Sequence, residues 1–345
     1  MKKTTTARLT AALAATALFA TACGSNGGGS GDGTSPAGDG AAESYSIGIA
    51  QYVSHPALDA AKDGFKSAFA DAGVEVDWDE QNAQADAGTV TSIVGSFATA
   101  DLDLVAAIAT PAAQGATQAI TDKPVVFMAV TDPVDAKIIA DWDAPGGNVT
   151  GVSDMNPVKE QLDLLNKLGV DAKTVGIVYS SGEPNSAVQV KQAEEAAAEL
   201  GMEIKKTTIT NSSEVQQGVQ ALGDVDAIYV PTDNAVVSAL ESVISYGESK
   251  QIPVIAAEGD SVARGAVATF GIDYTAHGKQ AGEMAVKILT DGGNPASMPA
   301  ERAPEDSLKL YVNEEAAEKM GVTIPEDMLA EAEKMTAEDA EESEG

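Results

Sequence analysis

Short apolar runs alternate with longer helix-forming segments along most of this chain, and this alternation constrains its fold more than any other feature. The stretch TVGIVYSSGEPNSAVQVKQAEEAAAELG at 174–201 is the clearest unit. Its apolar run at 175–179 predicts a buried strand, the polar residues at 180–186 a loop, and the Ala/Glu-rich segment at 187–200 a helix that Gly201 ends. Such units in succession predict parallel sheets with right-handed crossovers.

The two halves of the chain repeat short strings at a nearly constant offset. Ile47-Gly48-Ile49 stands 128 residues before Val175-Gly176-Ile177, and Pro124-Val125-Val126 stands 129 residues before Pro253-Val254-Ile255. Each string begins or ends a predicted element. We therefore predict an α/β fold of two doubly wound parallel-sheet lobes joined by a hinge, with a cleft between the carboxyl ends of their strands.

The domain boundaries follow from these repeats. Lobe 1 is expected to comprise residues 45–152 and about 275–305, and lobe 2 residues 153–274 and about 306–325. The turn-rich segment 145–151 is interpreted as part of the hinge. Residues 326–345 are interpreted as an acidic tail, because 338–344 carries five acidic residues and no basic one, which is typical of a solvated segment.

The first residues have the features of a secretory signal peptide. Two lysines precede an apolar stretch that ends in small residues before Cys23, and the stretch is too short for a permanent span. Residues 1–22 resemble a bacterial lipoprotein signal, although Ala20 stands where that pattern usually has leucine. The resemblance implies that Cys23 becomes the lipidated first residue, with palmitate as an expected acyl chain. Residues 23–44 then form a flexible Gly/Ser/Asp-rich tether on the outer surface of the cell membrane.

Charge and cysteine usage exclude several classes of function. The net charge of −32 argues against a nucleic-acid partner, which needs a basic face. Cys23 is the only cysteine, so the chain forms no internal disulfide and offers no cysteine metal cluster. The scattered acidic residues show no metal-ligand spacing. We expect a monomer without a metal or other cofactor.

Six polar loops follow the predicted strand ends, where open α/β sheets bind their ligands. Helix N-termini in these loops attract carboxylates, hydroxyl groups add donors, and Asp132 and Asp233 are expected to face a cation. A small zwitterion such as an amino acid suits this set. The alternative for each residue is a helix cap or a turn. The loops are 51–55, 110–114, 131–134, 180–186, 232–234 and 258–260.

Several strings on these loops resemble one known family. GIAQYVSHPALDAAKDGF, AIATPAAQ, TDPVDAK, PGGNVTGVSD, VYSSGEPNS, PTDN and GIDYTAHGKQAGE are similar to the solute-binding lipoproteins of ABC transporters that have the type I periplasmic-binding-protein fold. That family includes tryptophan- and tyrosine-binding members. The resemblance spans about 45–312 and implies delivery of a small solute to membrane permease subunits by closure of the two lobes. An aromatic amino acid is the favoured solute, with another small amino acid or a purine-like molecule as alternatives.

The resemblance and the loops together give the candidate binding residues. Between residues 51 and 153 these are Gln51, Tyr52, Thr110, Pro111, Ala112, Thr131, Asp132 and Ser153. In the second half they are Ser180, Ser181, Asn185, Ser186, Thr232, Asp233, Asn234 and Asp273. Aromatic rings near the cleft are expected from Tyr52, Phe127, Tyr179, Tyr229 and Tyr274, although core packing is the simpler interpretation for Phe127, Tyr179 and Tyr229, which lie in apolar runs.

Three other functions are alternatives to solute transport. A hydrolase is disfavoured, because the chain has only two histidines and neither a G-x-S-x-G nor an H-E-x-x-H motif. A transcription regulator of the same fold needs a basic helix-turn-helix head, which the signal and tether replace. A solute sensor for a signalling partner uses the same pocket, and the sequence does not separate it from a transport protein.

Overall fold

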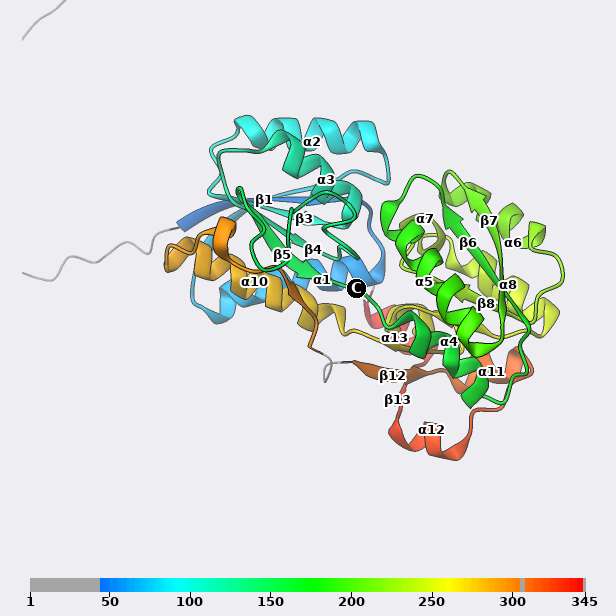
Figure 1. Cartoon of the computed structure of the whole chain (residues 1–345). Helices are drawn as coiled ribbons and strands as arrows, with labels where there is room; N and C mark the ends of the chain where they lie inside the picture. The colour runs from blue at the N-terminus through cyan, green and yellow to red at the C-terminus, as the bar shows by residue number, and fades with distance from the viewer. Residues whose placement is uncertain (1–43, 305–307, 344–345) are drawn as a thin grey trace, which may run out of the picture. The chain divides into compact units, whose positions relative to one another are not determined.

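The chain folds into two sheets that are each covered by helices (Figure 1). The computed structural model describes residues 44–304 and 308–343, and these belong to one compact unit. The predicted signal peptide, Cys23 and residues 24–43 lie outside the described residues. Within the described ranges, no helix has the length and apolar character needed to cross a bilayer.

Lobe 1 is built on a six-stranded sheet of order β11-β5-β4-β3-β1-β2, in which all pairs are parallel. Figure 1 shows α2 and α3 on one face of this sheet and α1 and α10 on the other. The elements are β1 (Ser44–Gln51), α1 (Pro56–Asp71), β2 (Glu75–Asn82), α2 (Ala87–Thr99), β3 (Leu104–Ile108), α3 (Thr110–Ala119), β4 (Val125–Met128), β5 (Val149–Ser153), α10 (Tyr274–Thr290), a 3₁₀ turn η2 (Pro295–Ser297) and β11 (Glu301–Arg302).

Lobe 2 has a seven-stranded sheet of order β13-β12-β10-β9-β8-β6-β7, parallel except for the pair β10 and β12. Helices α4 and α5 pack together on one side, and α6 and α8 on the other. The elements are α4 (Val158–Lys167), β6 (Thr174–Ser180), α5 (Pro184–Leu200), β7 (Glu203–Ile209), η1 (Ser212–Glu214), α6 (Val215–Ala221), β8 (Ala227–Val230), α7 (Asn234–Val237), α8 (Leu240–Lys250), β9 (Val254–Ala256), α9 (Gly259–Ala263), β10 (Ala268–Gly271), β12 (Lys309–Val312), α11 (Glu314–Lys319), α12 (Glu326–Glu331), β13 (Glu333–Lys334) and α13 (Ala337–Ser343).

The two lobes share one topology, which confirms the predicted pair of doubly wound lobes. The order β2-β1-β3-β4-β5 in the first sheet corresponds to β7-β6-β8-β9-β10 in the second. Gly48 and Gly176 occupy equivalent places on β1 and β6, where a Cβ atom would lie 2.8 Å from Leu102 and from Leu222. This strand order places ligand sites beyond the carboxyl ends of the strands.

The chain passes between the lobes at three points, and the predicted hinge at 145–151 is wrong in position. Residues 149–153 form β5, which pairs with β4, and the first crossing follows at 154–157. The second crossing is at 272–273, between β10 and α10, and the third joins β11 to β12. The strand was missed because Pro145 and two glycines precede it and because Thr150, Gly151 and Ser153 lack an apolar run.

Helices α1 and α10 make the tightest helix contact in lobe 1. A Cβ atom on Gly278 would lie 1.8 Å from the carbonyl oxygen of Ala61, and one on Gly64 would lie 2.0 Å from that of Thr275. The two backbones therefore approach closely only because both helices carry glycine at the contact. This contact fixes the start of α10, which lies next to the second crossing.

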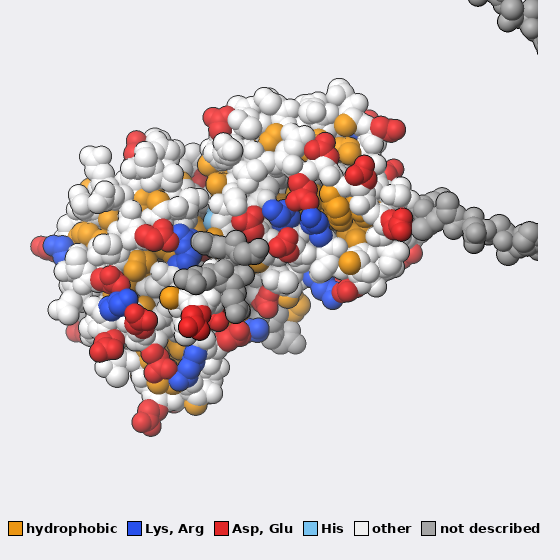
Figure 2. All heavy atoms as spheres, turned by 180° about the vertical axis from the view of Figure 1, so that it is seen from behind, with side chains coloured by type: hydrophobic (Ala, Val, Ile, Leu, Met, Phe, Trp, Pro, Cys, Tyr) orange, Lys and Arg blue, Asp and Glu red, His pale blue; other side chains and the backbone are white. Residues whose placement is uncertain are grey.

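The C-terminal residues differ from the predicted acidic tail. Strand β13 adds to β12, Met328 of α12 is buried, and α13 packs near α9. The reason is that apolar residues are interspersed with the acidic ones from 326 to 335 and join the core of lobe 2. Elsewhere the negative charge is dispersed, and Figure 2 shows Asp and Glu side chains spread over one face with Lys and Arg beside several of them.

Candidate functional site

A small cavity lies where the rims of the two lobes meet. Its free volume is about 10 Å³, which is room for about one water molecule, so the two rims are nearly closed on each other. Lobe 1 contributes His55, Leu58, Ala129 and Thr131, lobe 2 contributes Asn185, Thr232, Asn234, Val237 and Glu258, and the first two crossings contribute Asp154 and Tyr274.

The doubly wound topology explains why these residues meet. His55 follows β1, Thr131 follows β4, Asn185 follows β6, and Thr232 follows β8, each just beyond the carboxyl end of its strand. Each sheet brings its loops to one edge, and the two edges face each other across the crossings. The cavity is therefore the crevice that the fold predicts.

Gln189 of α5 connects the two rims. Its side chain is fully buried, its Oε1 accepts a hydrogen bond from the backbone N–H of Thr232, and its Nε2 donates to the Thr232 hydroxyl. The same Nε2 lies 3.4 Å from the hydroxyl oxygen of Thr131 in lobe 1. Ser153 holds Thr131 in turn by donating to its carbonyl oxygen at 2.8 Å. These bonds fix both threonines at the cavity wall.

A second contact between the lobes joins His55 to Asn234. The Nε2 atom of His55 lies 3.4 Å from Oδ1 of Asn234. The amide of Asn234 donates to the carboxylate of Glu183, which also accepts the backbone N–H groups of Asn234 and Ala235. Glu183 thereby orients Asn234 at the start of α7. Burial, and next the charge of nearby Asp233, raise the pKa of Glu183 to about 7.

Asp154 and Tyr274 join the two crossings that border the cavity. The Tyr274 hydroxyl donates to Oδ2 of Asp154 at 2.8 Å, and both side chains are buried. Burial raises the pKa of Asp154 to about 6, and the hydrogen bond from Tyr274 offsets part of this effect. A buried carboxyl group whose pKa lies close to neutral pH is a common feature of functional sites.

Glu258 is the second carboxyl at the cavity wall. Its Oε1 accepts a hydrogen bond from the Ser261 hydroxyl. Burial is the main reason that its pKa rises to about 7, followed by the negative charge of Asp260. The nearby guanidinium of Arg264 is bound to Glu241 and to the carbonyl oxygen of Val237. Among the described residues, neither Asp154 nor Glu258 therefore has a basic side chain as a direct partner.

Four of the predicted binding residues line the cavity, namely Thr131, Asn185, Thr232 and Asn234. The other candidates do not line it. Several of them cap helices or bond within their own turns, which is the alternative interpretation, and Ser153 supports a lining residue.

The polar candidates in lobe 2 are engaged within the protein. Asp233 caps α7 through the N–H of Val236 and accepts from the N–H of Ser180 and the hydroxyl of Ser186, so it does not face a cation. Ser181 is exposed and donates to Ile209. At the second crossing, Asp273 caps α10 through the N–H of Ala276 and pairs with Lys309.

The candidates in lobe 1 have similar structural roles. Asp132 accepts two backbone N–H groups of its own turn, from Val134 and Asp135. Gln51 donates to Val53 and Asp59, and the Tyr52 hydroxyl donates to the carbonyl oxygen of Ala85. None of these bonds involves the cavity. Ser153 differs from these residues, because its hydrogen bond supports Thr131, which lines the cavity.

The start of α3 departs from the sequence interpretation. Thr110 was expected to cap this helix, but the cap residue is Ala109, whose φ of 78° is in the left-handed region. The Thr110 hydroxyl is buried without a hydrogen-bond partner, and Pro111 and Ala112 complete the first turn outside the cavity lining. A strained backbone of this kind persists only when its surroundings enforce it.

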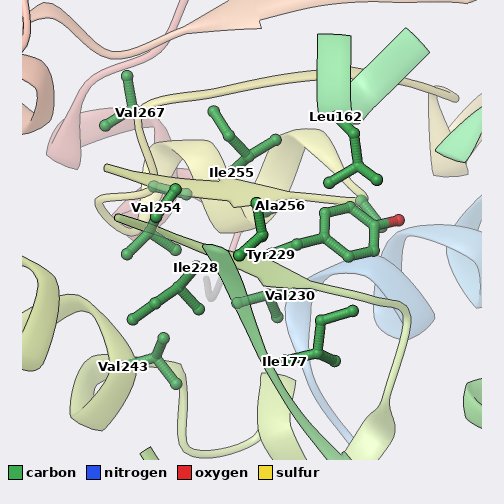
Figure 3. Packing of buried hydrophobic residues seen from close by; sticks show 14 of the residues in the cluster. Leu162, Ile177, Ile228, Tyr229, Val230, Val243, Val254, Ile255, Ala256 and Val267 are labelled. Carbon is green, nitrogen blue, oxygen red and sulfur yellow. The ribbon is translucent and has the colours of Figure 1, made fainter. Parts of the chain in front are cut away.

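Of the five predicted rings, Tyr274 alone lines the cavity. Phe127 and Tyr229 are fully buried in the two cores, and Tyr179 packs against the core of lobe 2. Figure 3 shows Tyr229 among the apolar residues of lobe 2, with Leu162 beside its ring. Its hydroxyl donates to Gln161 at 2.7 Å, which accounts for the polar end of the side chain.

Several lining residues were outside the predicted set: His55, Leu58, Ala129, Asp154, Val237 and Glu258. His55 and Glu258 lie in two of the six loops predicted to bind the ligand, so the sequence indicated the loops in which they lie. Asp154 follows a strand that the sequence did not reveal, and Leu58 and Val237 lie in the first turns of helices. No group of three His, Cys, Asp or Glu side chains in the described ranges is arranged to hold a metal ion.

The two-lobed fold with a cavity at the meeting rims defines the class of periplasmic binding proteins, and comparison with known proteins gives the family. The family model for ABC transporter substrate binding protein matches residues 46–336. A tyrosine-binding protein of Clostridioides difficile is 40% identical over 275 residues, which cover 78% of this chain and 79% of that protein. The chain belongs to the family of ABC transporter substrate-binding proteins.

Solved structures agree with this assignment. The ABC domain from Streptococcus pneumoniae in complex with L-Trp has a TM-score of 0.81 at 36% identity and covers 85% of this chain and all of that one. The ligand-free, open structure of a substrate binding protein with adhesive properties from Clostridium difficile has a TM-score of 0.65 at 41% identity, covering 85% and 99%. A solute binding protein from Bacillus halodurans with bound myo-inositol shares the fold at 16% identity, with a TM-score of 0.59 and coverage of 82% and 99%.

Proposed function

We propose that this protein is the extracytoplasmic binding component of an ABC importer, which captures an amino acid in the cavity by closure of its lobes and delivers it to the permease. The observation that carries the proposal is a cavity formed jointly by both rims and by two of the crossings. A ligand held there contacts both lobes at once, and closure of hinged domains around a ligand is an established kind of switch.

Two relatives, one solved with a ligand and one described as ligand-free and open, support closure. The L-Trp complex matches this structure with a TM-score of 0.81, whereas the ligand-free, open protein matches with 0.65 despite its higher sequence identity. The lower TM-score of the open protein is explained more simply by a different arrangement of its lobes than by sequence divergence. The contacts from His55 to Asn234 and from Gln189 to Thr131 are those expected of closed lobes.

Two relatives favour an aromatic amino acid as the solute, since the Clostridioides difficile protein is named for tyrosine and the Streptococcus pneumoniae structure was solved with L-Trp. Thermal-shift measurements on the purified protein test this choice. We expect L-tyrosine or L-tryptophan, at about 100 times its Kd, to raise the Tm by about 5 °C. Myo-inositol and adenosine serve as controls for the other solute classes. A shift with adenosine or myo-inositol, and none with any amino acid, would contradict the proposal.

The proposed location is the outer surface of the cell membrane, with Cys23 carrying the lipid and residues 24–44 as the tether. The signal-like sequence and the position of the only cysteine support this. Replacement Cys23→Ser is expected to move the exported protein from the membrane fraction to the soluble fraction, as measured by immunoblotting. Retention of the variant in the membrane fraction would argue against lipid attachment at Cys23.

A further inference from the structure

Three buried polar atoms on cavity-lining residues have no hydrogen-bond partner at bonding geometry: Oδ1 of Asp154, Oδ1 of Asn185 and Nδ1 of His55. All three side chains are at least nine-tenths buried. Unpaired buried polar groups are rare and costly in native proteins, so each requires an explanation. A ligand that pairs with them supplies one.

All three atoms are hydrogen-bond acceptors. Asn185 donates its Nδ2 to Glu183 and to the carbonyl oxygen of Thr232, which leaves its Oδ1 as the free atom. Asn234 donates its Nδ2 to Glu183, so its Oδ1 must accept from Nε2 of His55. Burial lowers the pKa of His55 to about 4, and in the neutral ring Nδ1 then carries a lone pair.

The hydrogen-bond donors at the cavity wall are mostly occupied. The Tyr274 hydroxyl donates to Asp154, and the amides of Asn185 and Asn234 donate to Glu183. No lysine or arginine is among the lining residues. The cavity therefore presents free acceptors and two carboxyls, Asp154 and Glu258, without a cation that the described residues supply.

We propose that the part of the cavity around Asp154 receives the protonated amine of the ligand, with the Asp154 carboxylate as the charge partner and the free oxygen of Asn185 and nitrogen of His55 as further acceptors. The inference rests on the proposed function, because it names the group by which a bound amino acid is selected. An ammonium group has three N–H donors and a positive charge, and it complements both the unpaired acceptors and the two acids.

The proposal makes the amine the group that determines specificity. A site built to pair with an N–H donor rejects an analogue that lacks it, because the buried acceptors are then left unpaired. Indole-3-propionate and 3-(4-hydroxyphenyl)propionate keep the ring and carboxylate of L-tryptophan and L-tyrosine but lack the amine. Tryptamine keeps the amine and lacks the carboxylate.

Isothermal titration calorimetry on the purified protein separates these ligands. We expect L-tryptophan or L-tyrosine to bind and its desamino analogue to bind at least about 100-fold more weakly. Equal affinity for the amino acid and its desamino analogue would overturn the inference and leave the proposed function intact. Failure of every amino acid to bind, in a panel of all common ones, would overturn both.

A pair of isosteric substitutions tests the residue itself. Asp154→Asn is expected to weaken binding of the amino acid by about 10- to 100-fold, because one charge-assisted hydrogen bond is lost. Asp132→Asn is the matched control, since Asp132 also follows a strand of lobe 1 but bonds only to its own turn. Unchanged affinity in Asp154→Asn, or an equal loss in both variants, would contradict the assignment. The ligand series on the unmodified protein does not depend on how either variant folds.

Discussion

At the scale of single residues, the site is defined by carboxyl groups in two different roles. Glu183 and Asp233 are buried but saturated with N–H and O–H donors, and they hold the start of α7 in place. Asp154 and Glu258 are buried at the cavity wall, and Asp154 keeps one oxygen unpaired. Saturated carboxyls stabilise the local structure, whereas an unsaturated buried one favours a partner from outside.

The titration of Asp154 gives a prediction for pH dependence. Its pKa is raised to about 6, that of Glu258 to about 7, and the groups around them are Tyr274, Asp260 and Arg264. A ligand amine attracts the ionised carboxylates and displaces their protons. Affinity for the amino acid is therefore expected to rise between about pH 5 and about pH 7.5, with proton release on binding.

Calorimetry in buffers of different ionisation enthalpy measures that proton release. His55, with its pKa lowered to about 4, stays neutral over this range and does not contribute. The ligand-free protein should become less stable over the same rise in pH, because a raised carboxyl pKa means that the folded state holds more protons than the unfolded state. Affinity that does not change with pH, in the native protein, would count against ionised Asp154 as the partner.

The sequence indicated the right loops but not which residues of a loop face the cavity. Asp233 and Asn234 are adjacent, yet Asp233 turns back to cap α7 while Asn234 lines the cavity. Capping and ligand binding favour the same residue types at the same place, so type and spacing do not distinguish them. Asp154 was missed for another reason, since its position depends on β5 and on the hydrogen bond to Tyr274, which is 120 residues away.

At the scale of elements, the contact between α1 and α10 carries a clear expectation for stability. Replacement Gly278→Ala places a Cβ atom 1.8 Å from the carbonyl oxygen of Ala61, which forces the helices apart. We expect a loss of about 1–3 kcal/mol or more in the free energy of unfolding. Chemical denaturation followed by circular dichroism measures this loss.

Gly95 provides the matched control for that substitution. It lies in the exposed part of α2, and a Cβ atom there would meet no atom within 4 Å. Gly95→Ala is expected to stabilise the protein by up to about 1 kcal/mol, because alanine is the better helix former. If Gly278→Ala were as stable as Gly95→Ala, the close helix contact would be wrong.

Most strands and helices of the doubly wound core were predictable because each has a clear apolar period and a glycine or proline boundary. Strand β5 lacked the apolar period, and Gly151 explains part of this. A Cβ atom at this position would lie 2.1 Å from the carbonyl oxygen of Phe127, so the neighbouring strand requires glycine although glycine is a poor strand former.

At the scale of the whole molecule, the side chain of Gln189 is placed to favour closed lobes. It does not line the cavity, but it bonds Thr232 in lobe 2 and lies close to Thr131 in lobe 1. Gln189→Ala is expected to weaken amino acid binding by about 2- to 10-fold, the effect of losing one hydrogen bond. Calorimetry gives the affinity, and small-angle scattering gives the radius of gyration with and without ligand.

Gln217→Ala is the control for this variant, because Gln217 is an exposed residue of α6 and does not line the cavity. It should leave affinity and the ligand-dependent change in radius unaltered. Affinity in Gln189→Ala equal to that of this control would show that the contact with Thr131 does not contribute to closure.

Because the chain passes between the lobes three times, the relative orientations in which the two rims can meet are restricted. A single connector would let one lobe twist and slide relative to the other, whereas three parallel connections leave mainly a swing about one axis. In the proposed closure, His55 then meets Asn234, and Gln189 meets Thr131, each time the lobes come together. Under this proposal, the orientational entropy of aligning the rims is lost when the protein folds and not when the ligand binds, so a small ligand suffices to hold the lobes closed.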